Sequence, residues 1–394
     1  MNEAVRNLRS RRHDVNLGWI LVAIGGVGVT LCSPALGSAQ QAASALYVRV
    51  DSDQTTVVTP RLSVQAPVDD RTKVDLTYSM DVWSSASIDI RSSASRAVTE
   101  KRDEVNAAVN HEFTDSALSL GYRFSYEPDY ESHSASLGLS FDFADKSSTL
   151  ALGGGVSFDD VGRAGDPNFD RSLETFSGQL TFTQILDTET FLQGVYSLNY
   201  SDGFQSSPYR YIGVGSWNGA CGGPLDESPV PAGVGSLEWC FPERNPEQRA
   251  RHAVVARVVR ALGSELSTWL AYRFYLDDWE LMSHTGTADL NWTPDNDTLF
   301  ALRYRFYLQS AAVHYRSRFP SITSLRRYFS RDKELSPFQS HRLMLEAERT
   351  WSFDTGEKFR AVLSVGPTMY LYSNFIPYKR LFAVEATVSG VFVL

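Results

Sequence analysis

The stretch LSLGYRFSYE, residues 118–127, alternates between two kinds of side chain. One set is apolar or aromatic: Leu118, Leu120, Tyr122, Phe124 and Tyr126. The other set is small, polar or charged: Ser119, Gly121, Arg123, Ser125 and Glu127. Successive side chains of a β-strand point to opposite faces of the sheet. The stretch therefore predicts a strand with one apolar and one polar face.

The same alternation returns along the chain, in residues 134–143, 175–182, 192–200 and 382–394. A soluble sandwich of two sheets would also alternate. Here, however, the polar faces are strongly polar, and the apolar faces carry aromatic residues near the strand ends. Strands of about ten residues with these two faces are typical of barrels in outer membranes. Beyond residue 40 the sequence has no apolar run long enough for a membrane-spanning helix.

The connections between strands give the strand count. Seven short turn sequences stand at residues 67–72, 113–117, 144–148, 186–190, 262–266, 293–297 and 353–358, and eight connections of uneven length lie between them. Fifteen connections imply sixteen strands, with fourteen to eighteen as the range. We predict an all-β fold: a transmembrane antiparallel up-and-down β-barrel of about 16 strands, formed by one domain over residues 40–394. Long outer loops are expected near 203–249 and 309–337.

The N-terminus predicts export. Four arginines precede an uncharged apolar run from Leu17 to Leu31, and small residues before Gln40 fit cleavage by a signal peptidase. Residues 1–39 are therefore expected to be a cleaved signal peptide, and the mature protein to reside in the outer membrane of a Gram-negative bacterium. Cleavage changes the net charge from -9 to -11, because four arginines and two acids are removed. This charge argues against a nucleic-acid partner.

Two cysteines, Cys221 and Cys240, remain in the mature chain. An even pair in an exported protein predicts a disulfide. In the chain-entropy model a loop of this size gains about 3 kcal/mol of stability from such a bond.

A short repeat points to the barrel interior: YRFYL stands at residues 272–276 and again at 304–308. Leu270, Tyr272 and Phe274 are expected to face lipid, as are Tyr304 and Phe306. The residues between them then line the lumen, together with an acid of the intervening strand: Arg273, Tyr275, Arg303, Arg305, Tyr307 and Asp289. The alternation adds three further lumen-lining arginines: Arg123, Arg257 and Arg360.

Charges inside a barrel require water or partners. The lumenal charges therefore fit either a water-filled passage that selects solutes or a network that closes the lumen. Barrels of sixteen or more strands generally enclose an aqueous channel, which favours the passage. Asp289 is expected to neutralise one of Arg273, Arg303 and Arg305, leaving a local preference for anions.

Several stretches resemble the bacterial domain-of-unknown-function family 3570, whose members are treated as outer-membrane β-barrel proteins. They lie at residues 81–105, 174–186, 200–210, 242–251, 272–285, 304–315 and 330–341. The resemblance implies a barrel without a settled activity. It also implies an association with thioredoxin-like or flavin-transfer proteins, and hence a redox-associated partner. The segment 216–240 lies outside the resemblance.

Motifs of enzymes are absent from the sequence: it has no G-x-S-x-G, H-E-x-x-H, P-loop or C-x-x-C. We predict no cofactor and no metal site, and no enzymatic activity. The expected function is a passive, porin-like channel for small polar solutes or ions, with outer-membrane lipid and the barrel-assembly machinery as partners. A non-enzymatic scaffold for a periplasmic or redox-associated partner is the alternative. A hydrolase at the barrel rim, built from Asp277, Asp278, His284 and His314, is a third.

Overall fold

The computed structural model describes residues 41–85, 98–215, 230–231, 237–354 and 356–393. Within these ranges, the helical elements are two 3-10 turns, η1 (Ile322–Ser324) and η2 (Lys333–Leu335). No helix in the described part of the chain is long and apolar enough to cross a membrane. The fold is all-β, which confirms the prediction from the alternation. The expected signal peptide, residues 1–39, lies outside the described residues.

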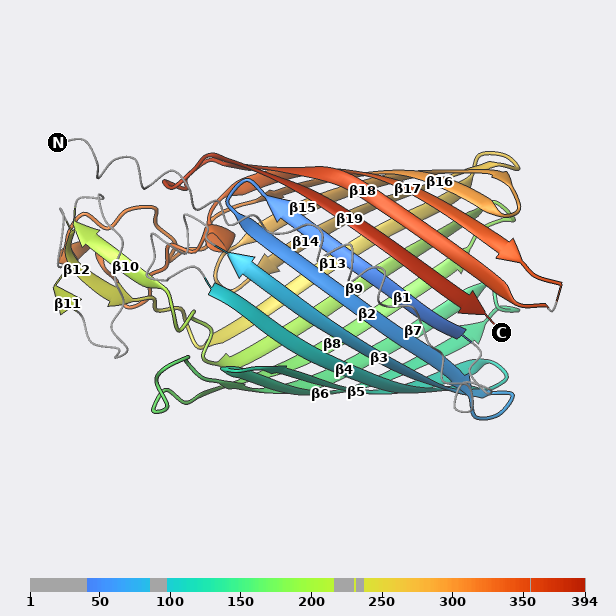
Figure 1. Ribbon diagram of the computed structural model, residues 1–394, viewed down its shortest axis with the longest axis horizontal. Coiled ribbons are helices and arrows are strands. Elements are labelled where there is room, and N and C mark those ends of the chain that lie inside the picture. Colours follow the sequence, from blue (N-terminus) through green and yellow to red (C-terminus); the bar gives the residue numbers. More distant parts are fainter. Residues whose placement is uncertain (1–40, 86–97, 216–229, 232–236, 355, 394) are drawn as a thin grey trace, which may run out of the picture. The chain divides into compact units, whose positions relative to one another are not determined.

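Sixteen strands form one closed antiparallel barrel (Figure 1). Their bounds are β1 Gln41–Asp51, β2 Thr55–Pro67, β3 Thr72–Ser85, β4 Val98–Glu112, β5 Ser116–Glu127, β6 Tyr130–Phe143, β7 Ser148–Val161, β8 Arg171–Ile185, β9 Thr190–Gly203, β13 Gln248–Ala261, β14 Leu266–Asp277, β15 Met282–Asp295, β16 Thr298–Gln309, β17 Phe338–Ser352, β18 Lys358–Tyr372 and β19 Arg380–Val393. The predicted strand count is confirmed.

Closure joins the two ends of the barrel domain. Each strand pairs with the next along the chain, β9 pairs with β13, and β19 pairs with β1 from Gln41↔Val393 to Asp51↔Ala383. A closed barrel leaves no strand edge with unpaired backbone N–H and C=O groups. This is the one sheet arrangement that can sit in an apolar medium.

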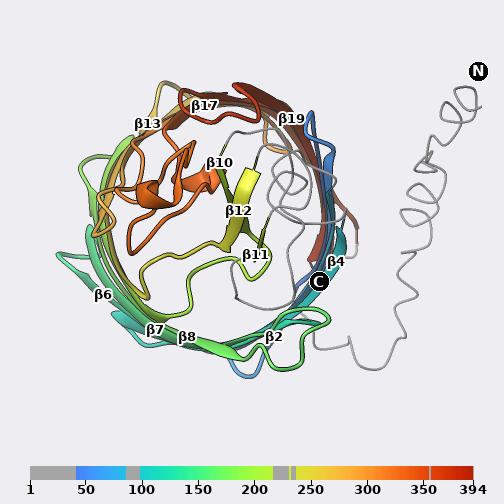
Figure 2. The same ribbon diagram turned by 90° about the vertical axis from the view of Figure 1, so that its left-hand side faces the viewer.

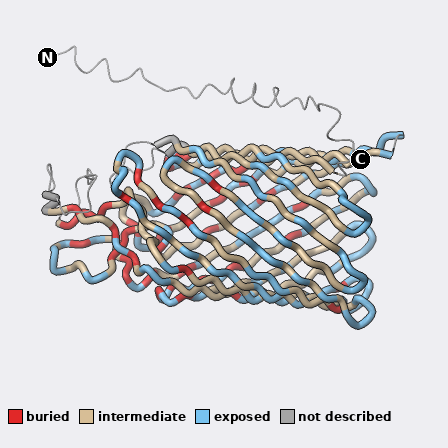
Figure 3. Tube along the Cα trace, turned by 90° about the horizontal axis from the view of Figure 1, so that it is seen from below, coloured by how far each residue is buried: buried red, intermediate tan, exposed pale blue. Residues whose placement is uncertain are grey.

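The two ends of the barrel differ. At one end, β1 begins, β19 ends, and short turns connect the strands. At the other end lie the long connections, among them those between β9 and β13 and between β16 and β17, which we call the mouth loops (residues 204–247 and 310–337). Figure 3 shows that buried residues gather at this loop-bearing end. The molecule therefore has its most tightly packed part at one opening.

Aspartate side chains stabilise the short connections by forming Asx-turns. The Asp69 carboxylate accepts hydrogen bonds from the Arg71 backbone N–H at 2.8 Å and the Thr72 hydroxyl at 2.9 Å. Asp187 accepts from the Glu189 backbone N–H at 2.8 Å in the same way. A short acidic side chain that bonds the backbone two residues on fixes a tight turn. The hydrogen bond from the Arg71 backbone N–H stabilises the Asp69 carboxylate and is the main reason that the pKa of this carboxyl is lowered.

The outward face carries the apolar residues. Leu120, Tyr122 and Tyr126 of the opening stretch are 46 to 49% exposed. The same holds for outward residues of the repeated motif, such as Tyr272 at 50% and Tyr304 at 41%. No second sheet covers these rows in the described residues, because the other sheet is a small one of three short strands at the barrel mouth. The alternative of a soluble sandwich is wrong.

The small sheet belongs to the first mouth loop. Its strands are β10 (Tyr211–Gly215), β12 (Leu237–Pro242) and β11 (Val230–Pro231), in that spatial order. Seen along the barrel axis, this sheet and the turns of the second mouth loop lie across the opening (Figure 2). The barrel wall and the mouth loops together set the geometry of the candidate site.

Candidate functional site

Inward-facing charges pair along the barrel wall without filling the lumen. Arg123 lies 3.8 Å from Glu104, and Arg360 lies 3.7 Å from Glu348. The side chains of both arginines nevertheless remain 49% and 45% exposed. Since they point into a closed barrel, this exposure means that other side chains do not fill the space beside them. An accessible lumen lowers the cost of keeping these groups charged.

Arg303 is the best neutralised of the three arginines in the repeated motif. Its Nε lies 3.4 Å from Asp289 Oδ2, and its Nη2 donates to Glu346 Oε1 at 2.7 Å. Asp289 therefore pairs with Arg303, on the neighbouring strand in direct register. Two carboxylates share one guanidinium at this point of the wall.

Arg273 and Arg305 have a different environment. Among the described residues, neither has a carboxylate oxygen within ion-pair distance. The Arg273 guanidinium lies 5.4 Å from the centre of the Tyr275 ring, and that of Arg305 lies 5.6 Å from the Tyr307 ring. Both copies of the motif thus place an arginine against the inward tyrosine two residues on, a cation–π arrangement. Their positive charges remain directed at the lumen.

Arg257 is held by neutral groups. Its Nη1 donates to Gln193 Oε1 at 2.8 Å, and its guanidinium lies 4.8 Å from the centre of the Trp269 ring. With Arg273 and Arg305, it adds a third positive charge to the wall formed by β13, β14 and β16.

The lumenal charge is unevenly distributed around the barrel. On β13 to β16 the inward arginines are Arg249, Arg251, Arg257, Arg273, Arg303 and Arg305, against the inward acids Asp277 and Asp289. On β3 to β7 the inward acids are Asp75, Asp81, Glu100, Glu104, Glu112, Glu127, Asp142 and Asp159, against Lys73, Arg102 and Arg123. Around the ring, these two groups of strands are separated by β8 and β9 on one side and by β17, β18, β19, β1 and β2 on the other. The lumen therefore has a basic wall and an acidic wall.

Hollows lie at the loop-bearing ends of both walls. One, of about 280 Å³, is lined on the basic wall by Arg249, Arg273, Tyr275, Trp279 and Tyr307, and from the mouth loops by Gln205, Asn245 and Asp332. The other, of about 390 Å³, is lined on the acidic wall by Asp81, Glu100, Arg102 and Glu127 with Tyr47 and Trp83.

The mouth loops are joined to each other by backbone and apolar contacts. The backbone N–H of Gly215 donates to the Phe319 carbonyl at 2.9 Å, and Arg244 and Phe329 exchange two backbone hydrogen bonds of 3.1 and 2.8 Å. Ile212, Val214, Phe319 and Phe329 form a buried apolar cluster. The two loops therefore form one packed unit.

This unit is attached to the inner wall of the barrel. Gln309, an inward residue at the end of β16, donates through Nε2 to the carbonyls of Glu334 and Ser336 at 2.8 and 2.6 Å. Trp279, Leu281, Ala312, Tyr315 and Leu335 form a buried cluster between the rim and the second mouth loop. The loop unit consequently narrows the opening from the basic side.

A buried ion network holds the two loops together. Arg210 of the first loop lies 2.6 Å from Asp332 of the second and 3.3 Å from Glu243, and Ser330 donates to Glu243 at 2.5 Å. Burial raises the pKa of the Glu243 carboxyl above its ordinary value, while Arg210 acts in the opposite sense. A guanidinium shared by two carboxylates is a strong link, and removing it leaves buried charge uncompensated.

His314 lies in the same packed region. Its Nε2 is 2.9 Å from Asn245 Oδ1 of the first loop, and its ring packs edge-on against Trp279. Burial lowers the pKa of the His314 imidazole from 6.5 to about 4, and the nearby charge of Arg249 adds to this effect. The neutral imidazole is therefore the form that fits this site.

The expected rim cluster is not assembled. Asp277 faces inward, where it accepts from Arg249 at 2.6 Å and Tyr275 at 2.7 Å and from the backbone N–H groups of Trp279 and Leu281. His284 faces outward, where its Nδ1 lies 2.6 Å from the Tyr272 hydroxyl. The Asp277 carboxylate and the His284 imidazole thus lie on opposite faces of the wall.

Two other site predictions concern the mouth and metals. Cys240 is buried in β12, whereas Cys221 lies outside the described residues, so that their disulfide stays a prediction. In the described part of the chain, no group of three or more His, Cys, Asp or Glu side chains is placed to hold a metal ion.

Two features of the site were not predicted from the sequence. Residues Arg210, Glu243 and Asp332 lie in irregular segments more than thirty positions apart, where no periodicity relates them. The histidines opposite the outward tyrosines were also missed, although the YRF triplets at 122–124, 272–274 and 304–306 each precede a histidine on the following strand.

These features define a class of protein: a wide β-barrel of the type found in outer membranes, with a charged, accessible lumen and a partly covered mouth. The chain belongs to the family described as a protein of unknown function, DUF3570, whose model matches residues 91–176 and 167–364. The resemblance found in the sequence is confirmed. Among curated proteins, none matches the chain.

Solved structures with a similar fold are barrels of outer membranes. The siderophore receptor PirA from Pseudomonas aeruginosa is 8% identical, with a TM-score of 0.42, 89% of this chain and 79% of PirA being covered. CdiB from Acinetobacter baumannii is 10% identical, with a TM-score of 0.47, and the match covers 88% of this chain and 60% of CdiB. A bacterial polysaccharide outer membrane secretin is 8% identical, with a TM-score of 0.46, and the match covers 90% of this chain and 99% of the secretin. At such identities and scores, none of the three carries an argument about what this chain does.

Proposed function

We propose that this protein resides in the bacterial outer membrane and acts there as a passive, porin-like channel for small polar solutes or ions. The outward rows of Leu, Phe and Tyr favour the membrane placement. Burying one such side chain away from water contributes about 1.5–3 kcal/mol, and dozens of large apolar side chains are exposed on this molecule. A barrel with this outer face is stable only where lipid covers it.

The observation that carries the channel proposal is the half-exposed state of charged side chains that point into the lumen. Arg123, Arg303 and Arg360 keep 44 to 49% of their side-chain surface accessible even though each lies beside a carboxylate. A closed network would bury such groups and exclude water. An accessible interior with a basic and an acidic wall instead favours passage of polar molecules, whose dipoles or charges both walls can orient.

Solute size is expected to be limited at the loop-bearing mouth. There the loop unit narrows the opening from the basic wall, through the contacts of Gln309 and the cluster around Trp279. Entry is therefore expected for sugars and small ions and not for large oligosaccharides.

Swelling of proteoliposomes tests the proposal. Liposomes that contain the purified, folded protein are diluted into isotonic solutions of a pentose or of a trisaccharide. We expect rapid swelling in the pentose and slow swelling in the trisaccharide. Swelling in the pentose no faster than that of protein-free liposomes would instead support a non-conducting scaffold for a periplasmic partner.

A further inference from the structure

The repeated motif also contains residues that face outward and do not line the lumen. In the YRF triplets at 122–124, 272–274 and 304–306, tyrosine and phenylalanine face outward, and a histidine of the next strand lies against both. The tyrosine hydroxyl lies 2.6, 2.6 and 2.8 Å from Nδ1 of His133, His284 and His341. The corresponding Phe and His ring centres are 5.0, 5.2 and 5.2 Å apart. Three pairs of strands thus carry the same outward arrangement.

A fourth pair has the same hydrogen bond. The Tyr196 hydroxyl lies 2.9 Å from Nδ1 of His252, with Leu198 in the place of the phenylalanine. All four histidines stand within the first five residues of their strands β6, β13, β15 and β17, at the loop-bearing end. We call these four pairs the Tyr–His belt. Four of the seven histidines of the chain are therefore placed on the outer face at the same end of the barrel.

Each pair in the belt has spare hydrogen-bonding capacity. If tyrosine donates to Nδ1, the neutral imidazole carries its hydrogen on Nε2; if Nδ1 donates, the tyrosine O–H is left over. In either tautomer one donor remains. His133 also lies 3.0 Å from Glu131, but for the pairs of His252, His284 and His341 the described residues supply no further partner. These three pairs each present an unused donor to the surroundings of the barrel.

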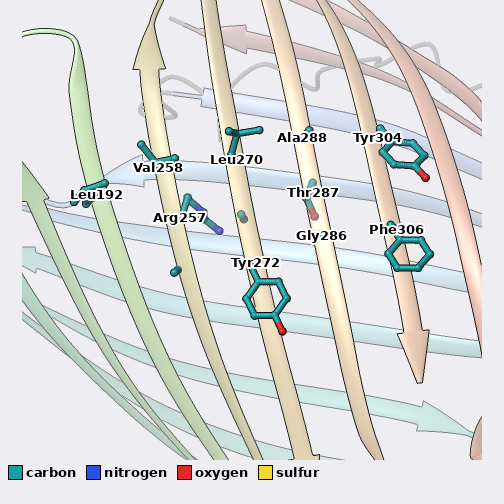
Figure 4. Close-up of a pocket in the computed structure, with 12 residues that line it drawn as sticks. Leu192, Arg257, Val258, Leu270, Tyr272, Gly286, Thr287, Ala288, Tyr304 and Phe306 are labelled. Carbon is teal, nitrogen blue, oxygen red and sulfur yellow. The ribbon is translucent and has the colours of Figure 1, made fainter. Parts of the chain in front are cut away.

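An apolar groove of about 540 Å³ begins beside two of the pairs. Tyr304 and Phe306 on β16 flank it at one end and Leu192 on β9 lies at the other, with Tyr272, Leu270 and Val258 between them (Figure 4). Its floor on β15 is formed by Gly286 and Ala288, so that no large side chain stands between Tyr272 and Phe306 (Figure 4). A Cβ added at Gly286 would meet nothing within 4 Å. The gap is thus real space on the outer face.

The structure assigns this groove and the adjoining Tyr–His pairs to one phosphate-bearing membrane lipid: an acyl chain in the groove over Gly286 and a phosphate headgroup at the pairs of His284 and His341. The inference rests on the membrane placement proposed above and not on conduction. His284 stands two residues from Gly286 on the same face of β15, a separation of roughly 6.6 Å. Donors and apolar groove are therefore as close together as the head and chains of one amphiphile.

The shape of the groove favours a lipid over a second copy of the chain. The outer wall is convex (Figure 2), and a second convex barrel could enter a groove only through side chains that project beyond its own surface. A flexible acyl chain can follow the groove along its length. The unused donors match the acceptor oxygens of a phosphate, since hydrogen bonds to a charged acceptor are the strong ones.

Native mass spectrometry of the full-length protein in a mild detergent tests the inference. The probes are phosphatidylglycerol and a diacylglycerol with the same chains, titrated against wild type and three variants. Gly286→Leu fills the groove, and the quadruple variant Tyr272→Phe, His284→Leu, Tyr304→Phe, His341→Leu removes both the imidazole and the phenol donors. Gly178→Leu is the matched control, because it is an outward strand glycine whose added Cβ also meets nothing within 4 Å. Heat-dependent electrophoretic mobility verifies that each variant is folded, and Ala288→Phe replaces Gly286→Leu if the latter does not fold.

We expect one phosphatidylglycerol per wild-type chain, bound at least tenfold more tightly than diacylglycerol. The quadruple variant, which lacks the donors of both pairs, should lose this tenfold preference. Gly286→Leu should weaken the binding of both lipids at least tenfold, and Gly178→Leu should change the binding of neither. If wild type and Gly286→Leu bind phosphatidylglycerol equally well, the assignment of the groove to an acyl chain is wrong. If wild type binds phosphatidylglycerol and diacylglycerol equally well, the assignment of the Tyr–His pairs to a phosphate headgroup is wrong. A dimer that Gly286→Leu dissociates would assign the groove to a second copy and overturn the inference. A protein that binds the lipid but conducts nothing would leave this inference standing and refute the channel.

Discussion

Arg273 and Arg305 provide the sharpest test of how the lumen selects ions. We consider the double variant Arg273→Gln, Arg305→Gln. Neither arginine has a carboxylate partner in the described residues, and both lie against tyrosines at 5.4 and 5.6 Å. Their replacement should therefore remove two positive charges from the lumen and leave no buried carboxylate without a partner.

The size of the effect follows from the barrel geometry. Sixteen strands about 4.8 Å apart and tilted by about 40° give a wall radius of about 16 Å. An arginine extended inward by about 6 Å places its charge about 10 Å from the axis. In water, two such charges act on a monovalent ion at the axis with about 0.8 kcal/mol, which screening at 0.1 M salt reduces to about 0.3 kcal/mol. Because anions gain this energy and cations lose it, the anion-to-cation permeability ratio should fall about threefold in the variant.

Reversal potentials in a planar bilayer under a salt gradient measure this ratio. At 1 M salt the Debye length of about 3 Å should abolish the difference between variant and wild type. Arg273→Lys, Arg305→Lys keeps the charge and should keep the ratio. Arg260→Gln removes an arginine that faces outward on β13 and should change it little. An unchanged ratio for the double glutamine variant at 0.1 M would refute the assignment of these arginines to a water-filled lumen.

Three further predictions concern the mouth loops. Arg210→Ala should leave Glu243 and Asp332 without their shared partner, which lowers the stability of the loop unit by about 3–5 kcal/mol. Thermolysin should then cleave the loops faster, and the conductance should rise. Arg327→Ala, at an exposed position of the second mouth loop, should change neither quantity. The pKa of His314 is lowered from 6.5 to about 4, so its contribution to loop stability is fully present above pH 6.5 and is lost as the pH falls toward 4, by about 3 kcal/mol in all. The pKa of Glu243 is raised, so that its titration changes loop stability with pH in the opposite sense. We therefore expect the increase of thermolysin cleavage at acid pH to be clearest in the Glu243→Gln variant. Adding His314→Gln to that variant should abolish the increase. Cys221 and Cys240 should resist alkylation until a reductant is added; alkylation without reductant would exclude their disulfide.

The barrel could be predicted from the sequence because its physics is local. Side chains alternate with the pleat, and one short stretch such as 118–127 already shows which residues face outward. The seven tight turns carry Asp, Gly and Ser at positions where such residues bond the backbone, as Asp69 and Asp187 do. Strand count, closure and the inward placement of Arg303 and of Asp289 follow from these two patterns.

The mouth could not be predicted in the same way. Arg210, Glu243 and Asp332 are brought together by chain segments that have no repeating pattern, and the distance of 122 positions between Arg210 and Asp332 has no local signature. Alternation also does not distinguish a paired inward arginine from an unpaired one, since Arg303 and Arg305 stand two residues apart on the same strand. Only the register of β15 and β17 shows that Arg303 alone meets two carboxylates.

Single-channel recording of the purified, folded protein in a planar bilayer tests the central claim most directly. The claim is that the charged interior of this barrel is a water-filled passage. It predicts stepwise conductance increments in 0.1 M salt and in 1 M salt, with increments that become larger in the Arg210→Ala variant as the loop unit loosens. A folded protein that inserts into the bilayer without any increments, in wild type and in Arg210→Ala alike, would contradict the claim and show that the lumen is closed below the loops.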